Sequence, residues 1–285
     1  MNRRTPVRSA IEAFSSLRLT IVLLALSILL IFAATLDQVN LGVWGVQVKY
    51  FHSFLVWDRI PGTGLKLPIF PGGYLLGGML LVNLIAAHVQ RFRFSMKKAG
   101  IWLTHLGLIL LLVGQGVSGL LQRDGQMRLD VGATRRYSES FRDVELALID
   151  TTNPAYDDVV AIPSSFLAAG RTVQHPRLPF LVKPIAYFPN AVLRMRSSGL
   201  EAAPSVATAG LGADVAVEPA PVTTKDNEAN WPAGYVELVA PDGSLGVWLV
   251  STMFAEPQTF AYRGRTWRIV LRAKRDYLPF SLTLL

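Results

Sequence analysis

Three long apolar stretches in the first 121 residues constrain this chain more than any other feature. They run from 17 to 36, from 72 to 89 and from 99 to 121. Each is close to the roughly 20 residues that a helix needs to cross about 30 Å of hydrocarbon. Residues 122–285 instead contain short, alternating β-like runs. The sequence therefore predicts a membrane α-helical domain with three transmembrane helices over residues 1–121, followed by a β-rich domain.

The distribution of charge predicts how the chain is oriented. Residues 1–121 hold 11 Lys and Arg but 3 Asp and Glu, so they carry the whole net charge of +8. The basic residues cluster before the first span and in the link 90–98, and such clusters mark cytoplasmic loops. We therefore predict a multi-pass protein of the plasma (inner) membrane with a cytoplasmic N-terminus and an extracytoplasmic, periplasmic domain over 122–285. A cleaved signal peptide is the alternative for the first span, but the apolar core of a signal is usually only about 7–15 residues long.

Composition excludes several classes of function. The pI of 9.9 does not indicate nucleic-acid binding, because the excess charge flanks the spans and forms no separate basic face. The chain has no cysteine, which excludes thiol catalysis, thiolate metal sites and covalent haem attachment through its own sulfur. Neither a P-loop nor an HExxH motif is present. We therefore predict no catalytic residue.

Local patterns predict the remaining elements. Apolar residues at helical spacing in 43–57 indicate an external amphipathic helix at the outer membrane surface. Turn signals at 241–243 and 263–265 predict two β-hairpins, and 179–188 reads as an edge strand interrupted by Pro184. The Ala-, Pro- and Gly-rich segment 197–232 predicts a long loop. Further strands are expected at 126–130 and 143–150.

His105 lies within the third apolar stretch, roughly 8–10 Å from its cytoplasmic end by helical rise. A titratable side chain inside a bilayer is costly, which makes it a functional-site hypothesis: a metal or haem ligand, or a proton carrier. The alternative is a polar residue facing the helix bundle that hydrogen-bonds a backbone carbonyl or Asn83. His88, at the cytoplasmic end of the second stretch, either shares an iron with His105 or is an interfacial residue.

The other two histidines are weaker candidates. His52 lies among aromatic residues, which favours an interfacial packing role, and His175 reads as a surface-loop residue.

Four stretches resemble the ResB (also called CcsB) proteins of cytochrome c biogenesis. They are Ser16-Leu-Arg-Leu-Thr-Ile-Val-Leu-Leu24 with the exit Ala34-Thr-Leu-Asp-Gln38, Lys49-Tyr-Phe-His-Ser53, Thr104-His-Leu-Gly-Leu108, and Lys274-Arg-Asp-Tyr-Leu-Pro-Phe-Ser-Leu-Thr-Leu-Leu285. The last is the most specific. The resemblance covers most of the chain except 190–235.

This resemblance implies a subunit of the system II cytochrome c synthase. Such a subunit pairs with a ResC/CcsA-type membrane protein, helps haem b across the membrane and helps deliver it to apocytochrome c. It implies that His105 ligates the haem iron inside the membrane, and that the chain is a non-catalytic or accessory subunit of a haem lyase complex. Family members continue to a fourth span, so the resemblance also suggests that this chain is truncated at its C-terminus.

Two rival interpretations stay open at this point. One is a self-contained membrane b-type cytochrome that uses His88 and His105 for electron transfer. The other is a haem-free scaffold whose β domain binds another envelope protein.

Overall fold

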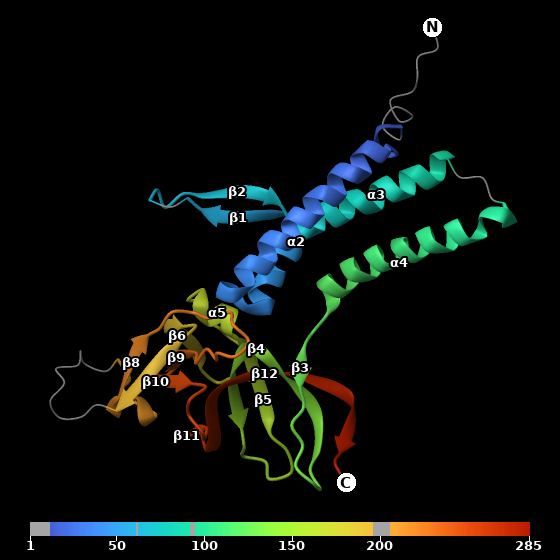
Figure 1. The fold of residues 1–285 in the computed structure, drawn as a ribbon. Coiled ribbons are helices and arrows are strands. Elements are labelled where there is room, and N and C mark those ends of the chain that lie inside the picture. The colour runs from blue at the N-terminus through green and yellow to red at the C-terminus, as the bar shows by residue number, and fades with distance from the viewer. Residues whose placement is uncertain (1–11, 61, 92–94, 196–205) are drawn as a thin grey trace. The chain divides into compact units, whose positions relative to one another are not determined.

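The computed structural model describes residues 12–60, 62–91, 95–195 and 206–285 (Figure 1). The chain forms two units. The helical unit comprises Met1–Gln122 and Thr224–Glu228, and the β unit comprises Arg123–Thr223 and Ala229–Leu285. Arg3, Arg4 and Arg8, on which the predicted orientation partly depends, lie outside the described residues.

Three helices of the helical unit are long and apolar enough to cross a membrane. They are α2 (Leu17–Val46), α3 (Gly73–Arg91) and α4 (Ala99–Leu121), the last preceded by the short 3₁₀ turn η2 (Met96–Lys98). The prediction of three long apolar helices is therefore confirmed. Helix α3 runs antiparallel to its two neighbours and packs against both (Figure 1). Large apolar side chains, such as Leu110 at 64% exposure, point away from the protein.

The segment 43–57 is not the single amphipathic helix that its spacing predicted. Helix α2 breaks at Gly42, whose φ of 71° and ψ of 174° are not helical, and resumes to Val46. A π turn, η1 (Gln47–Phe51), follows, and the chain then becomes strand β1 (Leu55–Arg59). Leu55-Val-Trp57 is strand-prone, and an antiparallel partner strand 11 residues downstream of Leu55, starting at Lys66, decides its conformation.

The partner of β1 is β2 (Lys66–Pro71), and together they form an antiparallel hairpin. Val56 at the root of the hairpin is completely buried against α2, η1 and α3. Phe70, opposite Val56 in the register, packs against the same cluster. The root is therefore part of the helical core, whose other buried members are Leu23, Leu30, Ala34, Val46, Tyr50 and Leu76.

The larger sheet of the β unit is built on two long strands, β4 (Thr134–Asp150) and β12 (Arg265–Thr283). They pair from Thr134 opposite Thr283 to Asp150 opposite Trp267, with irregularities between Ala273 and Arg275 and between Tyr277 and Leu282. Three shorter strands complete this sheet: β3 (Gly125–Gln126), β5 (Asp158–Pro163) and β11 (Gln258–Tyr262). The expected strand at 143–150 lies inside β4, whereas only Gln126 of the expected strand at 126–130 is extended in a ladder.

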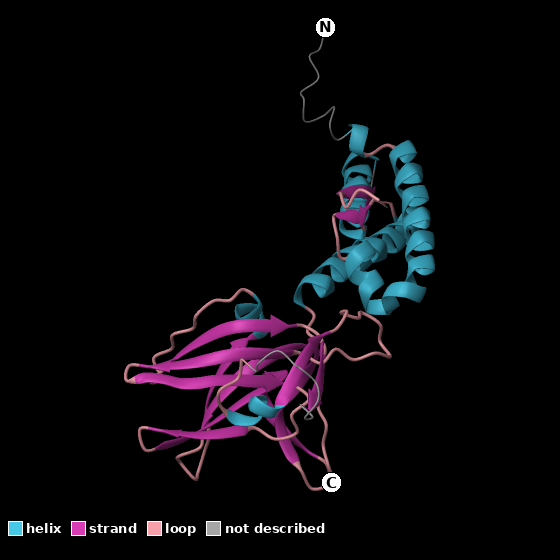
Figure 2. Cartoon of the chain, turned by 90° about the vertical axis from the view of Figure 1, so that its left-hand side faces the viewer, coloured by secondary structure: helices cyan, strands magenta, loops and turns pink. Residues whose placement is uncertain are grey.

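A three-stranded sheet packs on the larger one (Figure 2). Its order is β10 (Gly243–Ser251), β9 (Ala233–Ala240) and β6 (Leu181–Phe188). Leu146 of β4, Leu238 of β9 and Ile269 of β12 share one core and have no exposed surface. At about 1.5–3 kcal/mol for each fully buried large apolar side chain, this core is the main source of stability of the unit.

Both predicted hairpins and the interrupted edge strand are confirmed. The β9–β10 turn contains Gly243 at a φ of 135°, and the β11–β12 turn has Arg263 and Gly264 at φ values of 50° and 69°. Two successive positive φ angles match the twist of the flanking strands. Strand β6 lies at the edge of its sheet, and its register shifts next to Pro184, as the missing N–H of proline requires.

In the described part of 197–232, the prediction of a long loop is confirmed for 220–232, which contains no helix or strand, and is wrong for 210–219. This part contains η3 (Gly210–Asp214) and β8 (Val215–Pro219), and β8 pairs with β7 (Ala191–Met195). Its small residues allow close packing: a Cβ on Gly212 would lie 2.5 Å from the Cβ of Leu249. The short helix α5 (Ser164–Ala168) completes the unit.

Candidate functional site: a histidine pair and an ionic cluster in the helical unit

His105 points its Nδ1 at the main-chain oxygen of Ile101, 2.7 Å away and one helical turn earlier. A carbonyl oxygen can only accept, so Nδ1 carries the proton of the neutral imidazole. The lone pair then lies on Nε2, which is the atom that can bind a metal. Histidines that bind metals commonly fix their second nitrogen with such a bond to a backbone carbonyl.

Of the two partners expected if His105 is a polar residue without a ligand role, it has the backbone carbonyl and not Asn83. Asn83 is buried, and its amide nitrogen donates to the main-chain oxygens of Phe14 and Ser16 at 2.5 and 3.2 Å. Its side-chain oxygen accepts the hydroxyl of Thr20 at 2.7 Å. The polar residue in the middle of the second apolar stretch therefore ties α3 to the start of α2, which is a structural role.

His88 is brought next to His105 by the packing of α3 against α4. Their ring centroids are 4.9 Å apart, and the ring planes are inclined by 63°. The Nδ1 of His88 donates to the main-chain oxygen of Leu84 at 2.8 Å, so its tautomer matches that of His105. Trp102 contacts His88 edge-on, with centroids 6.0 Å apart. The structure thus places the two sequence-derived candidates in one cluster.

The separation of the two rings limits how they can meet a haem. A metal–imidazole nitrogen bond is about 2 Å long, so two axial imidazoles on one iron hold their centroids about 6 Å apart with the porphyrin between them. At 4.9 Å the rings contact each other directly. In this arrangement the two imidazoles could not ligate one haem iron from opposite faces of the porphyrin.

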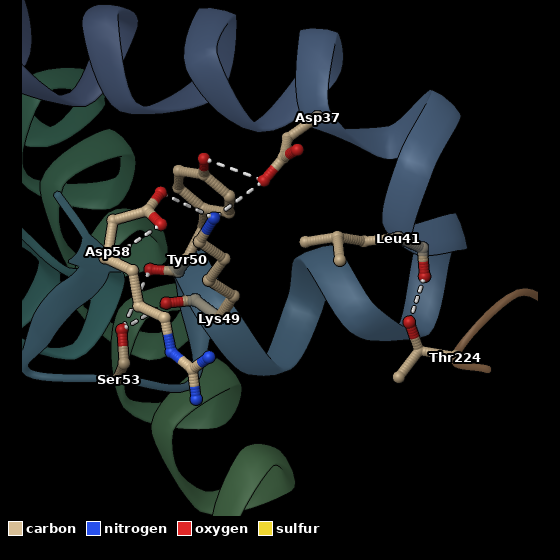
Figure 3. Close-up of polar contacts among 8 residues, drawn as sticks. Asp37, Leu41, Lys49, Tyr50, Ser53, Asp58 and Thr224 are labelled. Atoms are coloured by element: carbon tan, nitrogen blue, oxygen red, sulfur yellow. Dashed lines mark hydrogen bonds and ion pairs between the residues drawn. The ribbon is translucent and has the colours of Figure 1, made fainter. Parts of the chain in front are cut away.

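A second polar cluster, at the other end of the helical unit, was not identified from the sequence (Figure 3). The ammonium of Lys49 lies 2.8 Å from the carboxylate of Asp37 on α2 and 3.1 Å from that of Asp58 on β1. The hydroxyl of Tyr50 also donates to Asp37, at 3.1 Å. The hydrogen bond from Lys49, followed by that from the backbone of Arg59, lowers the pKa of Asp58 below its usual value.

This cluster uses two of the three acidic residues that the first 121 residues contain. The small number of acidic residues was the sequence feature that could have indicated this cluster, because a carboxylate beside an apolar span needs a cation nearby. The spacing of Asp37, Lys49 and Asp58 gave no indication of their contact, since a helix break, a π turn and a strand separate them.

His52 and His175 take no part in either cluster. The ring of His52 stacks on that of Tyr74, with centroids 5.6 Å apart and planes inclined by 8°. His175 lies in a turn of the β unit, where its Nδ1 accepts the backbone N–H of Arg177 at 3.3 Å. Among the described residues, no group of three or more His, Asp or Glu side chains is arranged to hold a metal ion.

The β unit has an open cavity of about 490 Å³ beside the end of β4. Asp150, which lines it, accepts bonds from Thr152 at 2.5 Å and from Arg265 at 3.1 Å. Burial opposes ionisation of Asp150, but the bonds from Thr152 and Arg265 outweigh it and lower its pKa. Asp158 pairs with Arg177 at 2.6 Å. The charges around this cavity neutralise one another, as in an ordinary surface ion-pair network.

Comparison with known proteins adds no assignment. No protein-family model matches the sequence, and a search of curated proteins returns no match. The functional interpretation therefore depends on the residues themselves and on the motifs quoted above.

Proposed function

We propose that this chain is a three-span membrane subunit for haem delivery in cytochrome c maturation, of the ResB/CcsB type. The observation that carries the proposal is the hydrogen bond that fixes the tautomer of His105. Its Nδ1 is fixed by the main-chain oxygen of Ile101, so its Nε2 lone pair is available for an iron. The helix that carries it has the composition of a membrane span.

The exposed surface of α4 supports the membrane location. This helix is fully described, and none of its 23 residues is buried. An apolar patch of this length is not left exposed to water in a soluble protein, whereas hydrocarbon covers it at no cost. The start of α2, the end of α3 and the start of α4 lie at one end of the helical unit (Figure 1). The turn η2, which precedes α4 at this end, carries Lys97 and Lys98. We therefore assign this end to the cytoplasm.

Haem is the cargo in this scheme. It enters near the cytoplasmic leaflet, where His105 supplies one axial imidazole. The second ligand comes from a ResC/CcsA-type partner, because the contact between the rings of His88 and His105 leaves no space for a porphyrin between them. Haem supplies the iron that these groups bind, and the chain's own residues hold and orient it. The β unit binds apocytochrome c or braces the partner.

The test is to co-express the full chain with a ResC/CcsA-type partner, purify the complex and record the haem spectrum. His105→Ala should lose most of the bound haem, because it removes the imidazole that ligates the iron. His175→Ala, which removes a histidine from a loop of the β unit, is the matched control and should retain it. A normal haem content in His105→Ala would refute the ligand role.

The adjacency of His88 and His105 also favours a second candidate, a membrane b-type cytochrome that works without a partner. In that case the two imidazoles separate to accept a porphyrin between them. Haem retained by the chain expressed alone, and lost in either single His→Ala variant, would support this candidate over the first.

A further inference from the structure

The β1–β2 hairpin exposes an unusual number of large apolar side chains. Beyond its buried root it projects away from α2 and α3 (Figure 1). Seven large apolar residues between positions 54 and 69 are at least 38% exposed: Phe54, Leu55, Trp57, Ile60, Leu65, Leu67 and Ile69. They occur on both strands and on both faces, so no face of the hairpin is suited to water.

Such a hairpin needs a covering surface. A two-stranded hairpin is at best marginally stable in water, and an exposed apolar edge invites aggregation. Among the described residues of the hairpin, Val56 and Phe70 at the root are the ones that pack in the helical core. Beyond the root, Asp58 pairs with Lys49, but the large apolar side chains stay at least 38% exposed. The two strands nevertheless remain paired, with one irregularity between Val56 and Trp57, as far as Arg59 opposite Lys66.

The direction of the hairpin is fixed by the ionic cluster around Lys49. The ammonium bridges Asp37 on α2 and Asp58 on β1, so it links the strand to the helix at one point (Figure 3). Ser53 adds a bond from its hydroxyl to the main-chain oxygen of Lys49, 2.8 Å away. The hairpin is therefore held at a set angle to the helices and is not a freely moving loop.

Its position and charge identify the covering surface. In the chain, the hairpin lies between η1, which follows α2, and the start of α3. With the membrane placement of the proposed function, both of its ends therefore stand where these helices leave the apolar layer. Trp57 belongs to the residue type that settles at the membrane–water interface. Arg59 and Lys66 lie opposite each other near the tip, and paired cations on an apolar hairpin complement anionic lipid headgroups.

We propose that the β1–β2 hairpin lies in the outer interface of the bilayer, with its apolar side chains among the acyl chains and with Arg59 and Lys66 at the phosphates. This inference rests on the membrane-spanning placement of the helices in the proposed function, and it is independent of haem. A hairpin placed in this way widens the contact of the helical unit with lipid and prevents α2 and α3 from moving along the membrane normal.

The absence of cysteine from the chain allows a direct test. Single cysteines carrying a nitroxide label are introduced into the full chain, which is then reconstituted in vesicles of phosphatidylcholine and phosphatidylglycerol. Leu67→Cys reports on the hairpin, Leu110→Cys on α4, and Thr259→Cys on an exposed position of the β unit. Power saturation of the electron spin resonance signal compares how often the label collides with oxygen and with a water-soluble nickel chelate. Oxygen concentrates in hydrocarbon, whereas the chelate stays in water.

We expect the labels at positions 67 and 110 to collide several-fold more often with oxygen than with the nickel chelate. The label at position 259 should collide more often with the nickel chelate. A label at 67 that behaves like the one at 259 would overturn the proposal and leave the membrane spans intact. Protection of 67 from both reagents would also overturn it, in favour of cover by a second copy of the chain. Nickel access at 110 would refute the spans, and the hairpin proposal with them.

The role of the two cations has its own test. In vesicles of phosphatidylcholine alone, the label at 67 should lie closer to water than in vesicles that also contain phosphatidylglycerol. Adding Arg59→Gln and Lys66→Gln should remove this difference. A difference that persists without the two cations would show that they do not recognise anionic headgroups.

Discussion

The hydroxyl of Thr224 donates a hydrogen bond of 2.7 Å to the main-chain oxygen of Leu41, 183 positions away in the sequence (Figure 3). Asp226 accepts the backbone N–H of Val43 at 3.0 Å. Both main-chain groups flank Gly42, where α2 breaks and its ladder of hydrogen bonds is interrupted. Segment 224–228 therefore supplies the partners that the helix cannot provide for itself, which explains why it belongs to the helical unit.

Thr224→Val keeps the shape of the side chain and removes the donor. We expect a local loss of about 1 kcal/mol, the usual contribution of one hydrogen bond, because the oxygen of Leu41 loses its partner. Hydrogen–deuterium exchange of the full chain in micelles should show faster exchange in peptides covering 38–50. Thr259→Val, at an exposed position of β11, is the control, and equal exchange in both variants would contradict this role of Thr224.

Gly42→Ala should disturb the same region more severely. A φ of 71° is unfavourable for any residue with a Cβ, and a Cβ here would lie 2.7 Å from the Cα of Lys225. Strain of this kind costs about 1–3 kcal/mol. We expect the 224–228 segment to detach and trypsin to cleave faster after Lys225.

The matched control for this variant is Gly264→Ala. Gly264 has a similar φ of 69°, but a Cβ added there would meet no other atom within 4 Å. This control should therefore strain a turn of the β unit without affecting cleavage after Lys225. Equal acceleration in both variants would show that general destabilisation is the cause.

Lys49→Met should loosen the root of the β1–β2 hairpin. It leaves the carboxylates of Asp37 and Asp58 facing one another without their shared cation. Since Lys49 is about a quarter exposed, we expect a loss of about 1–2 kcal/mol, below that of a fully buried pair. Faster hydrogen exchange across β1 is the measurement. Adding Asp37→Asn and Asp58→Asn should restore much of the protection, and no restoration would argue against repulsion as the cause.

The pair Tyr262–Asp242 should make the stability of the β unit depend on pH at both extremes. The phenol donates to the carboxylate at 2.7 Å. This bond lowers the pKa of Asp242 below 3.8 and raises that of Tyr262 above 10.0. The stability from the carboxylate is therefore present above pH 3.8 and is lost as pH falls through the lowered pKa. The stability from the phenol is present below pH 10 and is lost as pH rises through the raised pKa.

Urea unfolding of the full chain in micelles at several pH values, followed by tryptophan fluorescence, measures this dependence. In Asp242→Asn the urea midpoint should fall less at acid pH than in the unchanged protein. In Tyr262→Phe it should fall less at both acid and alkaline pH, because this variant removes the shared bond. An unchanged pH dependence of the midpoint in Tyr262→Phe would assign it to other groups.

Short-range patterns predicted much of this fold correctly. The three long helices follow from apolar runs of sufficient length, and the hairpins at 241–243 and 263–265 follow from turn residues that accept positive φ. These signals are local, since the residues that produce them lie next to one another in the chain. His88 and His105 also lie close together as the antiparallel order of adjacent helices suggested.

The errors concern contacts between separate elements, which the pattern within one element does not reveal. The helical spacing in 43–57 is real, but the pairing of β1 with Lys66–Pro71 overrides it. The composition of 206–232 resembles that of a loop, yet its small residues pack against Leu249. Nothing local indicates that Thr224 reaches Leu41, or that Lys49 joins two carboxylates across a turn.

His88 offers the sharpest distinction between a packing role and a ligand role. His88→Phe retains an aromatic ring able to contact His105 and Trp102 edge-on, but removes any nitrogen that could bind iron. We expect the complex with a ResC/CcsA-type partner to keep its haem in this variant, since one axial ligand comes from His105 and the other from the partner. His88→Ala should reduce haem moderately, because His105 loses its neighbouring ring. If His88→Phe loses haem as completely as His105→Ala, then His88 is itself the second ligand.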